Sequence, residues 1–306
     1  MGENMDFSKE TRRVYHNQHK RLANDDKSMT RYIGMFSMQY FGLDENYFVG
    51  KRILDAGCGD TVNLMIAVAK FGCTDLHGFD LGSEFLPVAK NTLLKYGVKE
   101  EHFTLNSASV LDIPYEDNYF DFVASHGVLL HLNNMNEVET AFRELARVTK
   151  PGGYLYAYVG AVGGIWEDAL NPAIRQYYRT NAEFKKLIDN INPSNFEEFF
   201  ELISKKIKEH TDEEIDLGFL KKYFDTDLCV TIQNVIQAPV RLAISEEFVN
   251  SEYKKYGFDS IRKLNRYVKR ENIRKFLAPL HYEKEYFLSK ILYGTGQSEF
   301  IAQKKN

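Results

Sequence analysis

A turn with two glycines, between a short apolar segment and a helical pattern, constrains the fold of this chain more than any other feature. Residues 53–61 are Ile-Leu-Asp-Ala-Gly-Cys-Gly-Asp-Thr, and a helix is expected over 62–71, ending at Gly72. Gly57 and Gly59 permit a tight turn and let a ligand approach the backbone closely, and the helix offers free N–H groups at its N-terminus. A strand, a glycine turn and a helix in this order predict a nucleotide-type binding site.

The spacing within the turn argues against a pyrophosphate ligand. A dinucleotide fingerprint needs a third small residue three positions after the second glycine, and Val62 occupies that position. Asp55 lies two residues before Gly57, where a carboxylate would repel a pyrophosphate but suit a ligand with an ammonium group. The turn resembles motif I of the class I S-adenosylmethionine-dependent methyltransferases, acid-x-Gly-x-Gly. The alternative is an ordinary βα junction of an α/β protein.

The segment after the first helix resembles motif II of the same family. Residues 75–79 predict a second strand that ends at Asp80, in the sequence Gly-Phe-Asp-Leu. This acid follows the glycine turn by about 20 residues, where a carboxylate can accept hydrogen bonds from both ribose hydroxyls. A helix cap is the alternative role for Asp80, but Ser83 is the better cap for the helix predicted over 84–96.

The segment after a third strand, expected over 103–105, departs from the family at one position. Ser109 stands where the family usually has an aspartate that bonds the adenine amino group, and its hydroxyl can still accept from that amine. The backbone N–H of Val110 is expected to meet the adenine ring. The cofactor contacts that the resemblance implies are Asp55, Ala56, Gly57, Asp80, Leu81, Ser109, Val110 and Ser125.

The fourth strand, expected over 120–124, ends at the sheet edge where open α/β proteins bind ligands. The residues that follow resemble motif IV of the family and begin with Ser125 and His126. His126 is the candidate catalytic residue, because a histidine can take a proton from an acceptor near neutral pH. The alternative is that His126 only bonds a loop. His131 is expected to be structural.

Residues 134–158 predict a helix and then a fifth strand. Asn134 and Glu137 have the spacing of a capping box. Residues 147–153, Arg-Val-Thr-Lys-Pro-Gly-Gly, are similar to the segment that precedes strand five in the family, and the strand itself is expected over 154–158.

The expected domain organisation adds helices to this core of residues 51–160. Residues 1–50 are expected to form a helical lid over the cofactor, with helices over 11–22 and 29–41. Tyr15 and His16 are its candidate substrate contacts; the alternative is that both are surface residues. An insertion over 161–240 is expected to form the acceptor pocket.

The insertion is helical by pattern, and the core resumes after it. Helices are predicted over 166–179, 182–191, 196–210 and 219–224, with a capping box at Ser194 and Glu197. Residues 241–306 are expected to complete the core with a helix over 245–256, strand six over 258–264 and strand seven over 298–304, and with a second addition over 267–295.

The first helix of the insertion carries the other candidate substrate-binding residues, Arg175 and Tyr178. Arg175 suits an acceptor carboxylate or phosphate because a guanidinium pairs with either in bidentate fashion; an ordinary surface ion pair is the alternative. Glu167 and Tyr177 are further candidates on this helix.

Composition excludes several other classes of protein. The 306 residues carry a net charge of −4, which argues against nucleic acid as a partner. The apolar runs are shorter than about 18 residues, so no membrane span is expected, and the N-terminus lacks the pattern of a signal peptide. Three scattered cysteines favour a reducing, cytoplasmic location, and no bound metal is expected. A homodimer is possible.

The sequence therefore predicts an α/β fold, a Rossmann-like, seven-stranded, mostly parallel sheet flanked by helices, with a helical insertion after strand five. The resemblance implies a methyltransferase that moves a methyl group from S-adenosylmethionine to an O, N, S or C atom of a small molecule, leaving S-adenosylhomocysteine. Two alternatives stay open: a cyclopropane-forming or lipid-directed enzyme with the same cofactor, and a non-catalytic S-adenosylmethionine-binding protein.

Overall fold

The computed structural model describes residues 8–211, 213–264 and 274–306, and its centre is a seven-stranded sheet of order β3-β2-β1-β4-β5-β7-β6. β1 to β5 are parallel to one another, and β7 is antiparallel to both β5 and β6. The predicted fold class is confirmed. The strands are β1 Arg52–Ala56, β2 Asp75–Asp80, β3 Phe103–Ser107, β4 Phe120–His126, β5 Thr149–Gly160, β6 Phe258–Leu264 and β7 Ser298–Lys304.

The central strands are buried on both faces, which is why they are almost continuously apolar in sequence. Ile53 belongs to the core on one side of the sheet and Leu54 to the core on the other, because successive side chains of a strand point to opposite faces. Helices α4 (Asn63–Lys70) and α5 (Phe85–Lys95) contribute to the first core. Helices α6 (Met135–Val148) and α11 (Glu246–Lys255) contribute to the second.

Two predicted caps around these helices need correction. The N-cap of α5 is Glu84, without a side-chain cap bond, so Ser83 does not have the predicted role. Asn134 does cap α6 by accepting from the backbone of Glu137, but the Glu137 carboxylate accepts from Asn133 and not from the backbone of Asn134.

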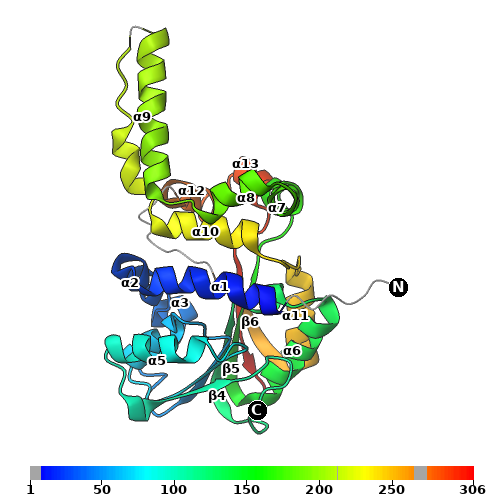
Figure 1. The fold of residues 1–306 in the computed structure, drawn as a ribbon. Coiled ribbons are helices and arrows are strands. Elements are labelled where there is room, and N and C mark those ends of the chain that lie inside the picture. The colour runs from blue at the N-terminus through cyan, green and yellow to red at the C-terminus, as the bar shows by residue number, and fades with distance from the viewer. Residues whose placement is uncertain (1–7, 212, 265–273) are drawn as a thin grey trace.

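The N-terminal helices differ from the prediction at one break. α1 (Ser8–Ala23) corresponds to the first predicted helix, whereas the second is divided into α2 (Asp26–Gly34) and α3 (Met38–Phe41). The break follows Gly34, and Ser37 starts a new helix by accepting a hydrogen bond from the backbone of Tyr40. In Figure 1, α1 lies between the sheet below it and α10 (Thr226–Gln237) above it, and α1 packs against α10.

The chain between β5 and α11 is helical as predicted, with different boundaries. It contains a π-helix η3 (Ile165–Leu170), α7 (Asn171–Thr180), α8 (Ala182–Asp189), α9 (Pro193–His210), a 3₁₀-helix η4 (Gly218–Tyr223) and α10. The capping box of α9 is formed by Asn192 and Asn195, not by Ser194 and Glu197. The sequence patterns did not predict α10. Figure 1 shows α9 projecting away from the rest of the molecule.

The second addition supplies α12 (Arg274–Tyr282) and α13 (Phe287–Tyr293) between β6 and β7. The predictions for residues 267–273 lie outside the described residues. Throughout the described ranges, no helix combines the length and apolarity that crossing a membrane requires.

Candidate functional site

The glycine turn after β1 is fixed to the end of β2 through its backbone. The N–H groups of Gly57 and Cys58 both donate to the carbonyl of Phe79, at 2.8 and 3.0 Å, and the N–H of Gly59 donates to Asp80 Oδ2 at 3.0 Å. Gly57 has a φ of +85°, and a Cβ on this residue would lie 2.2 Å from Val128. A side chain at this position is therefore excluded by both conformation and space.

Three aspartates lie at this turn in surroundings that disfavour their charged form. Burial, with the nearby Asp80 adding to it, raises the pKa of Asp55 to about 7. Burial, with Asp80 adding to it, raises the pKa of Asp60 to about 8. Burial also raises the pKa of Asp80, although its hydrogen bonds from backbone N–H groups oppose the shift. A ligand with positive charge would stabilise these carboxylates. We call Asp55, Asp60 and Asp80 the acidic cluster.

A cavity of about 900 Å³ opens beside the turn and extends to the insertion. Seven of the nine predicted cofactor and catalytic residues line it: Asp55, Gly57, Asp80, Leu81, Ser109, Val110 and His126. The side chains of Ala56 and Ser125 do not, because both are fully buried within the central strands. For these two residues only a backbone contact with a ligand stays a prediction.

His126 projects from the carboxyl end of β4 and is held by two tyrosines of β5. Its Nδ1 is 2.8 Å from the hydroxyl of Tyr156, and its ring stacks on Tyr158 with the centroids 4.9 Å apart. The Tyr156 hydroxyl donates to Glu299 at 3.1 Å, so its oxygen is available to accept from His126. In the tautomer that donates from Nδ1 to Tyr156, Nε2 is the basic nitrogen of the imidazole.

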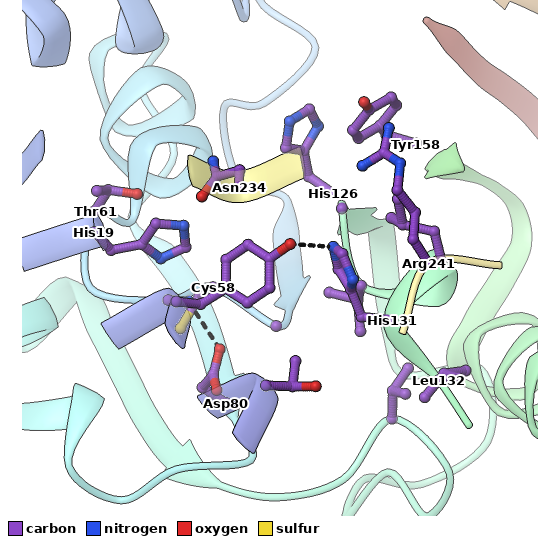
Figure 2. A pocket seen from close by; sticks show the side chains of 18 of the residues that line it. His19, Cys58, Thr61, Asp80, His126, His131, Leu132, Tyr158, Asn234 and Arg241 are labelled. Carbon is purple, nitrogen blue, oxygen red and sulfur yellow. Dashed lines mark hydrogen bonds between the residues drawn. The ribbon is translucent and has the colours of Figure 1, made fainter. Parts of the chain in front are cut away.

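His131, predicted to be structural, also lines the cavity. Its Nε2 is 2.7 Å from the Tyr15 hydroxyl, and its Nδ1 is 2.9 Å from the carbonyl of Val240. Burial lowers the pKa of His131 to about 3, so the ring is neutral near pH 7. Figure 2 shows the hydrogen bond between Tyr15 and His131 in the cavity, with Asp80 on one side of it and Arg241 on the other. Tyr15 lines the cavity as predicted for a lid residue, and His131 anchors it.

The other three predicted substrate residues do not line the cavity, which corrects the prediction. His16 Nδ1 lies 3.1 Å from Asp60 Oδ2, beneath the turn. Tyr178 is buried among apolar residues of the insertion and bonds Asp189 at 2.5 Å. Arg175 donates to the carbonyl of Val235 at 3.3 Å. A helical pattern identifies the face of a helix but not the neighbour to which that face turns.

The insertion and the segment directly after it reach the cavity through residues that sequence reasoning missed or left as further candidates. Arg241 Nε donates to Glu167 Oε2 at 3.3 Å, and both residues line the cavity. Asn234 of α10 lines it as well and faces it in Figure 2. The sequence does carry a signal for α10: Asp225 caps the helix by accepting from Leu228, and an N-cap acid before an apolar pattern predicts a helix.

Comparisons with known proteins agree on one family. A family model described as a methyltransferase domain matches residues 54–157. A ubiquinone/menaquinone biosynthesis C-methyltransferase of Chromobacterium violaceum is 31% identical over 181 residues, covering 56% of this chain and 68% of that protein. An uncharacterized methyltransferase of Schizosaccharomyces pombe is 35% identical over 109 residues, 34% of this chain and 38% of that protein.

The family-model match lies within the core, and the chain spans 38% and 42% of the length of two of the curated relatives. Among solved structures, magnesium protoporphyrin IX methyltransferase from Synechocystis has a TM-score of 0.54 and 12% identity, covering 98% of this chain and 100% of that one. At this identity the likeness concerns the fold alone.

Proposed function

Because the chain belongs to the class I S-adenosylmethionine-dependent methyltransferases, we propose that it methylates a small-molecule acceptor with S-adenosylmethionine as the donor. The observation that supports this proposal is the cavity of about 900 Å³. It is lined on one side by the aspartates at the edge of the sheet and on the other by polar and aromatic residues of the lid and the insertion. That volume suits a nucleoside cofactor together with a small second ligand.

The cofactor end of the cavity is formed by this chain's own turn residues. Gly57 and Gly59 leave space that a Cβ would fill, so a ligand can approach the backbone. Asp80 suits the ribose hydroxyls, and Asp55 suits the ammonium group of the methionine part. Ser109 and Val110 suit the adenine. When bound, S-adenosylmethionine supplies an electrophilic methyl group on a sulfonium.

The acceptor end is assigned to three parts of the chain: the lid (1–50), the insertion (161–240) and the C-terminal part (241–306). Each contributes to the wall, through Tyr15, Glu167 and Arg241 respectively. The role of these residues is to orient the acceptor for in-line attack and to exclude water. His126 Nε2 would take a proton from an acceptor that must lose one.

A planar aromatic acceptor is the class that the relatives favour. One is named as a ubiquinone/menaquinone biosynthesis C-methyltransferase and another as a demethylmenaquinone methyltransferase, and the ring of Tyr158 provides an aromatic surface beside His126. Methylation of such a ring, at carbon or at a hydroxyl oxygen, is the finer form of the proposal.

The test is to incubate the protein with S-adenosylmethionine labelled in the methyl group and a pool of small metabolites, and to search for labelled products by mass spectrometry. We expect one labelled metabolite and an equal amount of S-adenosylhomocysteine. Tight donor binding without any transfer would instead support a non-catalytic binding protein. Transfer to phospholipid acyl chains would support the lipid-directed alternative.

A further inference from the structure

The end of the cavity opposite the acidic cluster carries an excess of positive charge among the described residues. Three arginines surround the segment that leads from α10 to α11, and we call Arg175, Arg179 and Arg241 the guanidinium cluster. Arg175 donates to the carbonyl of Val235, and Arg179 donates to the carbonyls of Ala238 and Pro239. Both of these guanidiniums therefore bond neutral groups.

One carboxylate faces this cluster. Glu167 accepts from Arg241 Nε, and it is the carboxylate that acts most strongly on both Arg175 and Arg241 within the described part of the chain. One acid beside three guanidiniums leaves this region positive. The nearby ring of His131 cannot change that balance near pH 7, because burial keeps it neutral.

Arg241 is the member of the cluster that reaches the cavity. Its side chain is 13% exposed, and it lines the cavity together with Tyr15 and Tyr158. Among the described residues, the hydrogen bond that Arg241 makes runs from its Nε to Glu167, which leaves its two terminal nitrogens on the cavity side. Figure 2 shows its side chain beside Tyr158, across the cavity from Asp80. Four N–H groups on these two nitrogens thus remain to bind a ligand.

Burying a guanidinium to this degree costs free energy unless its N–H groups are paired, and Glu167 pairs with Nε but not with the two terminal nitrogens. Nη1 and Nη2 lie in one plane and can each donate to one oxygen of a carboxylate or phosphate, which is the strongest pairing open to an arginine. The Tyr15 and Tyr158 side chains present phenol groups beside it, which suits an aromatic body behind the charged group.

We propose that the acceptor carries an oxyanion, of the carboxylate or phosphate type, that pairs with Arg241. The inference rests on the proposed function, since it assigns Arg241 to the acceptor of that reaction. The cavity then has opposite charges at its two ends, with Asp55 and Asp80 facing the cationic donor and Arg241 facing an anionic acceptor. Such polarity favours one orientation of the two ligands and disfavours the reverse.

The test uses the full-length protein saturated with S-adenosylhomocysteine and three probes of similar size: benzoate, phenyl phosphate and phenol. Calorimetry gives the affinity of each. We expect at least one anion to bind about tenfold more tightly than phenol, and Arg241→Gln to weaken that anion about 10- to 100-fold while leaving phenol unchanged. The tighter of the two anions identifies the charged group.

Two variants serve as controls. Arg143→Gln makes the same change in net charge at an exposed position of α6, outside the cavity, and should leave all three affinities unchanged. Arg175→Gln removes a charge of the guanidinium cluster at a residue that does not line the cavity, and it should have a smaller effect than Arg241→Gln.

Equal affinity for phenol and both anions, binding of neither anion, or equal losses in Arg241→Gln and Arg143→Gln would each overturn the inference. S-adenosylhomocysteine affinity is measured first in every variant. If the unmodified protein fails to bind it, the proposed function fails; if it binds but shows no preference for an anion, only the further inference fails.

Discussion

At the scale of single residues, the turn after β1 combines a tight backbone conformation with two buried carboxylates, Asp55 and Asp60, and the half-buried carboxylate of Asp80. The backbone groups that a phosphate would use are already committed, because Gly57 and Cys58 donate to Phe79 and Gly59 donates to Asp80. The turn therefore offers carboxylate oxygens and not N–H groups to a ligand. This is the physical reason that the site suits a cationic, hydroxyl-bearing ligand and not a pyrophosphate.

Replacing Asp80 tests the proposed ribose contact. Asp80→Ala removes the oxygens that would accept from two hydroxyls, and we expect S-adenosylmethionine to bind about 10- to 100-fold more weakly by calorimetry. Asp112→Ala, which removes a carboxylate at an exposed position, is the control for the change in net charge. An unchanged affinity in Asp80→Ala would refute the ribose role, and denaturant unfolding shows whether loss of the bonds from Gly59 and Gly82 has disturbed the turn.

The raised pKa of Asp55 predicts that donor binding depends on pH. An ammonium group favours the ionised carboxylate, so Asp55, with a pKa of about 7 in the free protein, should lose a proton when the donor binds. We expect affinity to rise about tenfold between pH 6 and pH 8, to level off above pH 8, and to be accompanied by proton release. Calorimetry in buffers of different ionisation enthalpy measures the release. Asp55→Asn should abolish it; a release of unchanged size there would assign the proton to another group.

Replacing His126 separates chemistry from binding. If His126 takes a proton from the acceptor, His126→Ala should lower kcat by about 100-fold or more, with donor affinity nearly unchanged. His210→Ala, at an exposed position on α9, is the matched control. Equal losses of turnover and donor binding, or no loss, would exclude His126 as the acceptor-side residue.

At the scale of elements, the helices after β5 have two different relations to the cavity. α10 packs against α1, with Gln18 donating to Gln237 at 2.7 Å and Arg21 donating to Gln233 at 2.6 Å, and it supplies cavity residues. α9 packs against η4 and contributes no residue to the cavity. We call residues 196–224, which contain most of α9 and all of η4, the projecting unit. The ring centroids of its first and last residues, Phe196 and Phe224, are 4.7 Å apart.

The projecting unit should be removable. Because its two ends lie close together, replacing residues 196–224 by a short Gly/Ser linker should leave donor affinity within about twofold and the protein folded. Calorimetry and circular dichroism check this. Deleting 161–240, which also removes α10 and Glu167, should abolish acceptor selection; this comparison requires that the larger deletion be shown to fold. Loss of donor binding in the smaller deletion would mean that α9 supports the core.

At the scale of the whole molecule, burial lowers the pKa values of two histidines and raises those of two aspartates. These shifts link the free energy of unfolding to pH. His19 and His131 have pKa values lowered by burial, to about 4 and about 3, so they are fully neutral in both folded and unfolded chains well above pH 6.5. Asp55 and Asp60 have pKa values raised to about 7 and 8, so between pH 4 and 8 these two carboxyls bind more protons in the folded protein than in the unfolded chain.

The sign of the effect above pH 6.5 follows from the aspartates. A raised carboxyl pKa gives stability at low pH that is lost as pH rises through the folded-state value, so the donor-free protein should become less stable from pH 6.5 to 8. Denaturant unfolding at several pH values measures this change. Asp60→Asn should reduce the slope of the free energy of unfolding against pH, and Asp112→Asn should not. A free energy of unfolding that rises from pH 6.5 to 8 would contradict the claim that burial disfavours the charged form of these aspartates.

The sequence alone determined the sheet, the family and which residues gather at the carboxyl edge of the sheet. Each of these depends on residues close together in the chain: the glycine turn of 53–61, the acid at Asp80 and the segment 147–153. Short-range patterns fix strands, turns and helix ends locally, and the carboxyl ends of parallel strands must meet at one edge of a sheet. The order of the strands and their ends therefore suffices to predict that Asp55, Gly57, Asp80 and His126 lie together, as they do around the cavity.

Only the tertiary structure decided how the lid and the insertion meet that edge. Arg241, Glu167, His131 and Tyr15 come from four separate parts of the chain, and their contacts depend on how α1 and α10 pack, which no local pattern specifies. The same reason explains why Arg175 and Tyr178, on the predicted helix, turn to the insertion's interior instead. Burial follows from long-range packing, and so do the pKa shifts and the charge polarity of the cavity, because the free energy of a charge depends on everything around it.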